Sequence, residues 1–332
     1  MRLMDQICQA TGPILVQNND DGGVFELPGC SALASSVALC PLRFVLDDIV
    51  AETCTRLGFC DDTLVGRAVD ILRCPAPSLW IEFRAAARNN VYAETDRLAD
   101  AVLQFPMQRI GLLVQSDRSG RRGTIHSCWE NREPHAPHVA PFFAEFDFDR
   151  PADSVSRSRG DASNAAHLEV RVDDFPALEG LFRHLRFCFQ PEWLSYYRNR
   201  CKSQQEFQRT VEAAVKPLAE DIPFFAAFVL LLMAGNATRK IPVELSALNK
   251  ARRKRGKAPL MDHVELRLEL GGADDIGAAS YASSRSAARF HFVRGHLVRR
   301  GSAVFWRVAH MRGQKSLGII ARRTVSLGIA AE

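Results

Sequence analysis

The sequence lacks the segments that place a protein in a membrane or direct it out of the cell. Its longest apolar run, residues 224–235, has 12 residues, whereas a helix needs roughly 20 to cross a bilayer. The N-terminal segment has an acidic residue at position 5 and no continuous apolar stretch, so neither a signal peptide nor an anchor is expected. We therefore predict a cytoplasmic protein with no membrane partner.

Paired cysteines are also missing. The 9 cysteines are odd in number and include no C-x-x-C pair. Disulfide frameworks use even sets of cysteines in oxidising compartments, so this pattern argues against disulfides. We expect buried free thiols instead, because unpaired cysteine is among the most buried of all side chains.

The common catalytic signatures are absent as well. The sequence contains no Walker loop, no G-x-G-x-x-G, no G-x-S-x-G and no H-E-x-x-H, the motifs that identify several large classes of enzyme. No catalytic residue is therefore assigned and no cofactor is expected. Whether the protein is an enzyme stays open at this point, with a non-enzymatic role favoured.

What the sequence does have is a strong asymmetry of charge. Residues 239–332 contain 19 of the 43 Lys and Arg but 7 of the 38 Asp and Glu, which gives this segment a net charge of +12. Residues 1–238 carry a net charge of −7. A basic segment attached to an acidic body is typical of a protein that binds a polyanion, and the polyanion we expect is nucleic acid.

Hydrophobic periodicity predicts an α+β fold with three parts: an acidic N-terminal helix-plus-sheet body, central helices and a C-terminal basic strand-rich module. We place an N-terminal α+β domain at residues 1–155, a helical segment packing on the core at 156–238, and the basic module at 239–332. Helices are expected at 42–57, 62–72 and 224–235, with another after a capping box of Ser203 and Glu206. Strands are expected at 79–83, 110–115, 124–129, 142–148 and 168–172, and a linker or long loop at 150–163.

The basic module is predicted to begin with a short cationic helix at 246–255, closed by Gly256. A half-buried strand follows at 263–270, where Leu266 and Leu268 point inward and His263 points outward. Residues 271–286 are rich in Gly, Ala and Ser and are expected to form a mobile loop. The remaining strands are expected at 288–300, 304–310 and 317–327.

Two cationic segments of this module, residues 249–257 and 289–300, are the candidate binding surface. In the second, Arg289 and His291 alternate with phenylalanines, so a strand would present its cations on one face. Guanidinium groups suit phosphate oxygens, and nearby rings suit stacked bases. The alternative is a solvated face, or arginines paired with acids inside the fold. The expected nucleic-acid contacts are Lys250, Arg252, Arg253, Arg255, Lys257, Arg289, His291, Arg294, His296, Arg299, Arg300 and Trp306, with Trp306 as the stacking platform.

The same residues carry a resemblance to a known group of proteins. LNKARRKRGKAPL at 248–260 and RFHFVRGHLVRR at 289–300, followed by Trp306 and HMRG at 310–313, resemble segments of a protein family of tailed phages and prophages. That family shows LN-K-x-R-x-K-x-GK-x-PL and R-x-H-x-x-RGH-x-RR in the same order. The resemblance implies a phage or mobile-element origin, hence the cytoplasm of a host cell, and it implies no particular activity.

Two side-chain sets suggest metal sites. His126, Cys128, His135 and His138 would supply four zinc ligands if the end of a hairpin brought them together, although their spacing matches no established finger. Glu145, Asp147 and Asp149 share one face of a strand and are of the type that holds Mg²⁺ in nucleases, with His291 or His296 as a general base. An ordinary hairpin end and a solvent-facing strand are favoured over these sites, so no metal is predicted.

These observations favour a nucleic-acid-binding accessory protein of a phage or prophage that contacts mainly the phosphate backbone. One alternative is a metal-dependent nuclease that uses the acidic strand. Another is a structural or host-protein-interaction protein, in which the arginines bind an acidic protein partner or hold a homo-oligomer together.

Overall fold

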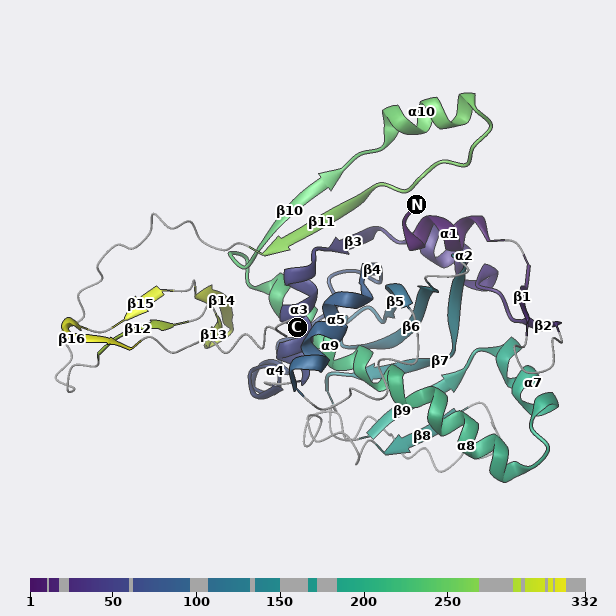
Figure 1. Cartoon of the computed structure of the whole chain (residues 1–332), viewed down its shortest axis with the longest axis horizontal. Coiled ribbons are helices and arrows are strands. Elements are labelled where there is room, and N and C mark those ends of the chain that lie inside the picture. Colours follow the sequence, from purple (N-terminus) through teal and green to yellow (C-terminus); the bar gives the residue numbers. More distant parts are fainter. Residues whose placement is uncertain are drawn as a thin grey trace, which may run out of the picture.

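The computed structural model describes residues 1–10, 12–17, 24–59, 62–95, 107–131, 135–149, 167–171, 184–268, 289–293, 296–307, 310–312 and 314–320. Within these ranges, nine strands form one mixed sheet in the order β10-β11-β3-β4-β5-β6-β7-β9-β8, with helices packed around it (Figure 1). Its strands are β3 (Leu42–Leu46), β4 (Ser78–Arg84), β5 (Met107–Ser116), β6 (Arg122–Asn131), β7 (Pro137–Asp147), β8 (His167–Arg171), β9 (His184–Phe189), β10 (Thr238–Val243) and β11 (His263–Leu268). The pairs β11–β3 and β3–β4 are parallel, and the other pairs of neighbours are antiparallel.

The helices and the smaller strands complete the α+β fold, which confirms the expected class. The helices are α1 (Leu3–Gln9), α2 (Ser31–Leu39), α3 (Asp48–Phe59), α4 (Asp62–Ala68), α5 (Ala85–Thr95), α7 (Pro191–Arg200), α8 (Gln204–Val215), the 3₁₀ helix η2 (Lys216–Glu220), α9 (Asp221–Met233) and α10 (Ser246–Lys254). Outside the large sheet lie β1 (Ile14–Gln17), β2 (Val24–Leu27), β12 (Arg289–Val293), β13 (His296–Arg300), β14 (Ala303–Arg307), β15 (His310–Arg312) and β16 (Gln314–Ile320).

The centre of the core is α9, the helix that the apolar run at 224–235 predicts. Residues 221–231 are all buried, as expected for a helix that is apolar on every side. Its phenylalanines pack on the sheet: the ring centroids of Phe224 and Phe83 are 4.5 Å apart, and those of Phe228 and Phe44 are 5.5 Å apart. Gly58 of α3 lets the two helices approach closely, since a Cβ at this position would lie 2.8 Å from the carbonyl group of Pro223.

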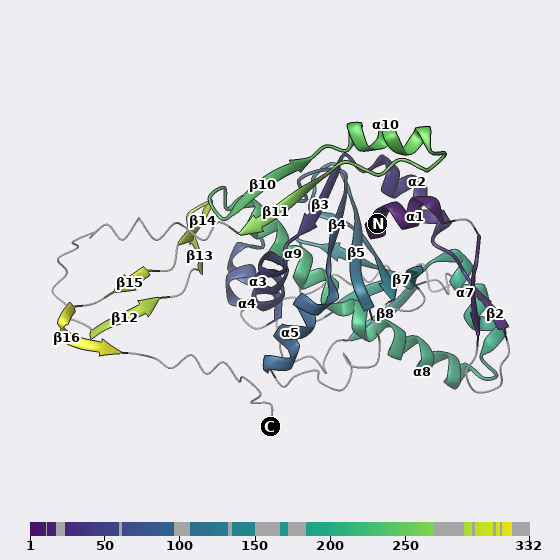
Figure 2. The ribbon, with the colours of Figure 1, turned by 45° about the horizontal axis from the view of Figure 1, so that its top comes forward.

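The opposite face of the sheet is covered by α1 and α2, and Figure 2 shows the two layers on either side of the central strands. Side chains alternate along β4, so Phe83 points to α9 whereas Trp80 and Glu82 point to α1. Glu82 is 1% exposed, and its carboxylate accepts hydrogen bonds from the backbone N–H groups of Leu3 and Met4 at 3.0 and 3.1 Å. Burial raises the pKa of this carboxyl group.

A buried ionic cluster joins α5, β6 and α9. Arg88 donates to Asp221 Oδ1 at 2.8 Å, and its guanidinium lies 4.9 and 4.8 Å from the ring centroids of two phenylalanines. Ser127 donates to the other oxygen of Asp221, and Tyr92 donates to the neighbouring Glu220. Burial raises the pKa of Glu220 to about 7. Each ionisable side chain of this cluster therefore has either a partner of opposite charge or a hydrogen bond.

The sequence prediction for residues 42–57 is wrong in its first part. Residues 42–46 form β3 rather than a helix, and Asp47 caps α3 by accepting a hydrogen bond from Val50 N at 2.8 Å. β3 lies between β11 and β4, and its consecutive residues 44–46 are apolar and buried, so this part of its sequence shows no alternation. A short run of this kind has the same periodicity as a buried helix. The following helix, α4, also ends at Ala68, before the expected residue 72.

Most of the other predicted elements are present. β4, the hairpin of β5 and β6, and β7 cover the expected strands. At α8, Ser203 Oγ accepts from Glu206 N at 3.1 Å, while the Glu206 side chain accepts from Lys202 N, one residue earlier than in a standard capping box. The expected linker at 150–163 falls among residues outside the described ranges, as does the expected loop at 271–286.

The expected boundaries at 156 and 239 do not coincide with breaks in the sheet. β8 and β9 lie within the segment predicted as helical, and β10 and β11, from the predicted basic module, extend the nine-stranded sheet beside β3. Leu266 is fully buried in β11 as predicted, but His263 is also buried, at 8% exposure. The reason is that α1 covers this end of the strand: Arg2 Nη2 lies 3.3 Å from Glu265, and Asp5 accepts from Met261 N.

The described C-terminal strands form two small units. β15, β12 and β16 make a three-stranded sheet, and β13 pairs with β14 as a hairpin. The hairpin packs on the body through Leu297, Val304 and Trp306, which are at most 8% exposed. No helix in the part of the chain that the structure describes combines the length and the apolar character that a membrane crossing requires.

Candidate nucleic-acid interface

Residues 238–268 form an arm, here called the cationic arm, in which β10 leads out to α10 and β11 leads back. Both views show α10 at the far end of this hairpin (Figure 1, Figure 2). Asn249 fixes the tip, because its side chain donates to Leu260 O and accepts from Leu260 N, each at 2.8 Å. Gly256 ends the helix with a φ of +67°, a conformation that glycine adopts without strain. The tip is therefore a defined structure rather than a loose loop.

The tip of the arm has an uncompensated positive charge. Six cations lie between residues 250 and 257, and residues 245–261 include no Asp or Glu. Five of the six side chains are exposed, and Arg252 is half-buried because its Nε donates to Ala258 O at 2.8 Å. Among the described residues, no ion pair involves any of them. The six are Lys250, Arg252, Arg253, Lys254, Arg255 and Lys257.

Four cations of the arm were missing from the sequence prediction: Arg239, Lys240, Lys254 and Arg267. Lys254 lies within the predicted segment, and its exposure follows from the helix. Arg239 and Lys240 are exposed on β10. In the strand register, Arg239 lies directly opposite Arg267 of β11. Like charges at such positions destabilise a strand pair. The alternation around 239–243 is too short to show that this segment is a strand, so the sequence gives no signal for these two residues.

Arg299 has a structural partner. Its guanidinium makes two hydrogen bonds with Asp70, at 2.6 and 2.8 Å, and further bonds with the carbonyl groups of Arg67 and Gly301. The hydrogen bonds from Arg299 lower the pKa of Asp70. This arrangement connects β13 to the end of α4. Arg299 therefore follows the alternative expectation, in which an arginine pairs with an acidic residue of the fold.

Trp306 is not a stacking platform, contrary to the prediction. Its residue is 8% exposed, and its backbone N–H and C=O bond to the side chain of Asn236, both at 2.8 Å. Val304 and Trp306 share the inner face of β14, which leaves Phe305 between them on the outer face. The sequence shows the alternation but not which face is buried. The exposed Arg300 lies over the Phe305 ring, 5.4 Å from its centroid.

The structure does not bring the two cationic segments onto one surface. β12 and β13 lie on the opposite side of the molecule from α10 in both views (Figure 1, Figure 2). Arg289, His291 and His296 belong to these strands, although the positions of their side chains are not among the described features. Arg294 lies outside the described residues. Of the predicted surface, the arm is thus the part whose side chains the structure describes most fully.

The three histidines among the four candidate zinc ligands have separate partners, and the cysteine is buried. His126 Nδ1 bonds to Gln190 at 2.9 Å, and burial lowers the pKa of His126 to about 4. His138 bonds to Asn131 at 3.1 Å, His135 lies 3.6 Å from Glu130, and Cys128 is fully buried. Across the described ranges, no cluster of three or more His, Cys, Asp or Glu is arranged to hold a metal ion.

The three candidate magnesium ligands on and after β7 are neutralised by arginines. Glu145 lies 3.3 Å from Arg186 and Asp147 lies 3.1 Å from Arg122. Asp149 accepts a hydrogen bond from Arg121, which lowers the pKa of this carboxyl group. No observation on this strand favours the nuclease alternative.

Comparison with known proteins adds no family to this description. No protein-family model, no curated protein and no solved structure matches the chain.

Proposed function

We propose that the protein binds nucleic acid through the cationic arm and that phosphate contacts provide most of the binding free energy. The observation that carries this proposal is the group of six cations at the tip of the arm, which have no acidic partner within the described chain. Uncompensated charge of one sign raises the local concentration of a polyanion and releases its counterions on binding.

The arrangement of the cations suits a phosphate backbone. Lys250 lies three residues before Arg253 and four before Lys254, so these three cations lie on one side of α10. Arginine presents several N–H donors in a plane and binds phosphate oxygens in pairs. Contacts of this kind fix the position of a nucleic acid without reading its sequence.

The biological setting is a second part of the proposal. The segments at 248–260 and 289–300 resemble those of tailed phages and prophages, so we place the protein among the accessory proteins of such elements, acting in the cytoplasm of the host. An acidic protein partner and a homo-oligomer remain the competing explanations of the arm, and each predicts binding without nucleic acid.

The test is a charge reversal with a matched control. The arm variant carries Lys250→Glu, Arg253→Glu and Lys257→Glu, and the control carries Arg118→Glu, Arg198→Glu and Lys202→Glu, three exposed cations away from the arm. Both change the net charge equally. Binding of labelled 20-residue DNA and RNA strands is measured by fluorescence anisotropy. We expect the arm variant to lose at least about 100-fold in affinity, from the loss of three phosphate contacts, and the control to change little.

Two outcomes would contradict the proposal. Equal losses in both variants would mean that net charge, and not the arm, determines binding. No binding of any nucleic acid by the unaltered protein, together with a stable complex or oligomer in its absence, would favour the protein-partner explanations.

A further inference from the structure

α10 is exposed on almost every side. Of its 9 residues, Asn249 is buried, Arg252 is half-buried and the others are exposed. The side chains of these two residues bond within the arm, to Leu260 and Ala258. Surface helices of globular proteins normally bury one side against the core. α10 is instead held at the outer margin of the molecule on a hairpin (Figure 1, Figure 2), so most of its surface is accessible to a partner.

The two inward residues determine which side of α10 faces outward. Successive residues of an α-helix are turned by about 100° around the helix axis. With this spacing, the side opposite Asn249 and Arg252 has Ala247 and Lys254 near its centre, and Ala251 lies beside them. All three outward residues are exposed. The outward side therefore combines two small side chains with a cation.

Cations flank this outward side at both edges. Arg253 precedes Lys254 and Arg255 follows it, so the three consecutive cations spread over an arc of roughly 200° around the helix axis. All three are exposed, and no ion pair of the described residues involves them. A single strand lying along the helix would contact one edge. Two rows of phosphates, one on each side of the helix, would engage both edges.

The major groove of duplex DNA provides two such rows. The groove is about 12 Å wide and admits an α-helix, which measures about 10–12 Å across with its side chains. The major groove of double-stranded RNA is deep and narrow, and side chains cannot read it. Ala247 and Ala251 suit the wider groove, because their small side chains let the helix backbone approach the base pairs closely.

We propose that the ligand of the cationic arm is duplex DNA and that α10 enters its major groove. Lys250 and Arg253 contact phosphates of one strand, and Arg255 contacts phosphates of the other. The two alanines face the base pairs and offer them no side-chain hydrogen bond, so little preference for base sequence is expected. This inference rests on the proposed function, to which it adds the type of nucleic acid and the groove.

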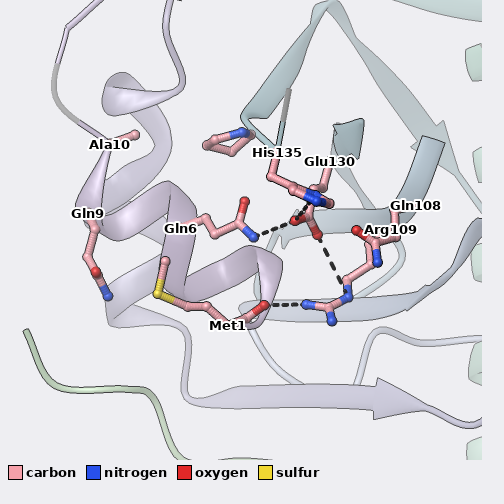
Figure 3. A pocket seen from close by; sticks show the side chains of 9 residues that line it. Met1, Gln6, Gln9, Ala10, Gln108, Arg109, Glu130 and His135 are labelled. Atoms are coloured by element: carbon pink, nitrogen blue, oxygen red, sulfur yellow. Dashed lines mark hydrogen bonds and ion pairs between the residues drawn. The ribbon is translucent and has the colours of Figure 1, made fainter. Parts of the chain in front are cut away.

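Arg109 of the body is a contrasting case. It lines a polar pocket between α1 and β6, where it lies 3.9 Å from Glu82 and 3.8 Å from Glu130 (Figure 3). Glu130 also accepts a hydrogen bond from Gln6 at 2.7 Å. A guanidinium between two carboxylates contributes no excess positive charge for a phosphate to meet. The cations at the tip of the arm have no such neighbours, which is why the duplex is assigned to α10.

The first experiment compares ligands on the unaltered full chain by fluorescence anisotropy. A 20-base-pair DNA duplex, an RNA duplex of the same sequence and one DNA strand are titrated in turn. We expect the DNA duplex to bind at least tenfold more tightly than the RNA duplex, because both have phosphates but only the DNA groove admits the helix. A DNA duplex with glucosylated 5-hydroxymethylcytosines, whose sugars occupy the major groove, should also lose at least tenfold in affinity.

A variant tests the inserted side without a change of charge. Ala251→Trp places a ring between the helix and the base pairs, so we expect the DNA duplex to bind at least tenfold more weakly. The single strand should bind equally well or more tightly, because its bases stack on an aromatic ring. The control Ala93→Trp adds the same ring at an exposed alanine of α5 and should change neither affinity. If Ala251→Trp fails to fold, the glucosylated duplex still decides on the unaltered protein.

The outcomes distinguish this inference from the proposed function. Equal affinity for the DNA duplex, the RNA duplex and the single strand would overturn insertion of α10, while binding of phosphates by the arm would stand. Equal affinity for the plain and the glucosylated duplex would have the same meaning. If the unaltered protein bound none of these ligands, both proposals would fail.

Discussion

The cationic arm and the buried ionic cluster use arginine in opposite ways. In the cluster, Arg88 donates to Asp221 and lies against two aromatic rings, 5% exposed. At the tip of the arm, Arg253, Lys254 and Arg255 are exposed and have no acidic partner in the described chain. A buried charge persists only when it is paired, because an unpaired one loses its hydration without compensation. An exposed unpaired cation costs little folding free energy. A cluster of such cations at one site is therefore best explained by an anionic ligand that binds there.

The salt dependence of binding gives the largest expected effect and tests the arm directly. If the six tip cations each contact a phosphate, the logarithm of affinity for duplex DNA should fall with the logarithm of salt concentration with a slope of about −5. Between 50 and 200 mM salt this is a loss of roughly 10³-fold. Anisotropy titrations at four salt concentrations measure the slope. A slope near zero would show that these cations do not release counterions.

Removal of Arg88 tests the other half of the comparison. Arg88→Ala leaves Asp221 buried without its cation, and breaking a buried pair in this way costs about 3–5 kcal/mol of unfolding free energy. Urea denaturation measures the change. Arg253→Ala is the matched control and should stay within about 0.5 kcal/mol. Similar losses of unfolding free energy in both variants would show that the arginines of the two regions contribute equally to stability.

The pH dependence of stability sharpens the description of the cluster. The pKa of Glu220 is about 7 in the folded protein against 4.5 for an unperturbed group, so the folded state holds this proton more tightly than the unfolded state. The unfolding free energy should therefore fall as pH rises from about 4.5 to 7, by up to about 3 kcal/mol from this group. Urea denaturation of the protein and of Glu220→Gln across this range isolates the contribution. A variant with the same pH profile as the unaltered protein would show that Glu220 does not titrate there.

The smallest expected effect concerns the clamp at the tip of the arm. Asn249→Ala removes both hydrogen bonds to Leu260, at a cost of about 1–2 kcal/mol for groups of this kind. Because the cations remain, we expect weaker binding but an unchanged salt slope. Hydrogen exchange at Leu260 N and anisotropy titrations measure the two effects. A changed slope would mean that the clamp sets the number of phosphate contacts and not only their arrangement.

The regular elements were the predictable part of this protein. The apolar run at α9 predicts a buried helix, and the alternation along β7 predicts a strand. Both elements are present as predicted. β3 was missed because a strand buried on both faces loses the period of two that marks it. Alternation in β14 was visible, but only the packing of the hairpin on the body shows that Trp306 faces inward.

The contact between Gln6 and Glu130 could not be predicted from the sequence, for a different reason. Gln6 and Glu130 are 124 residues apart in the chain, and neither belongs to a recognised motif. They meet because α1 covers the sheet at a point where Gln108 interrupts the register. A contact that depends on tertiary packing and on a single bulge leaves no pattern in local sequence, whereas the charge of the arm is a property of composition and is visible at once.

The position of β10 at one edge of the nine-stranded sheet has a consequence for self-association. An open edge offers unpaired N–H and C=O groups to a strand of another copy, and proteins counter this with charge and proline at the edge. β10 has both, since Arg239 and Lys240 are exposed and Pro242 has no N–H to donate. The edge strand that carries the arm is therefore protected against aggregation by the same kind of residues that make the arm cationic.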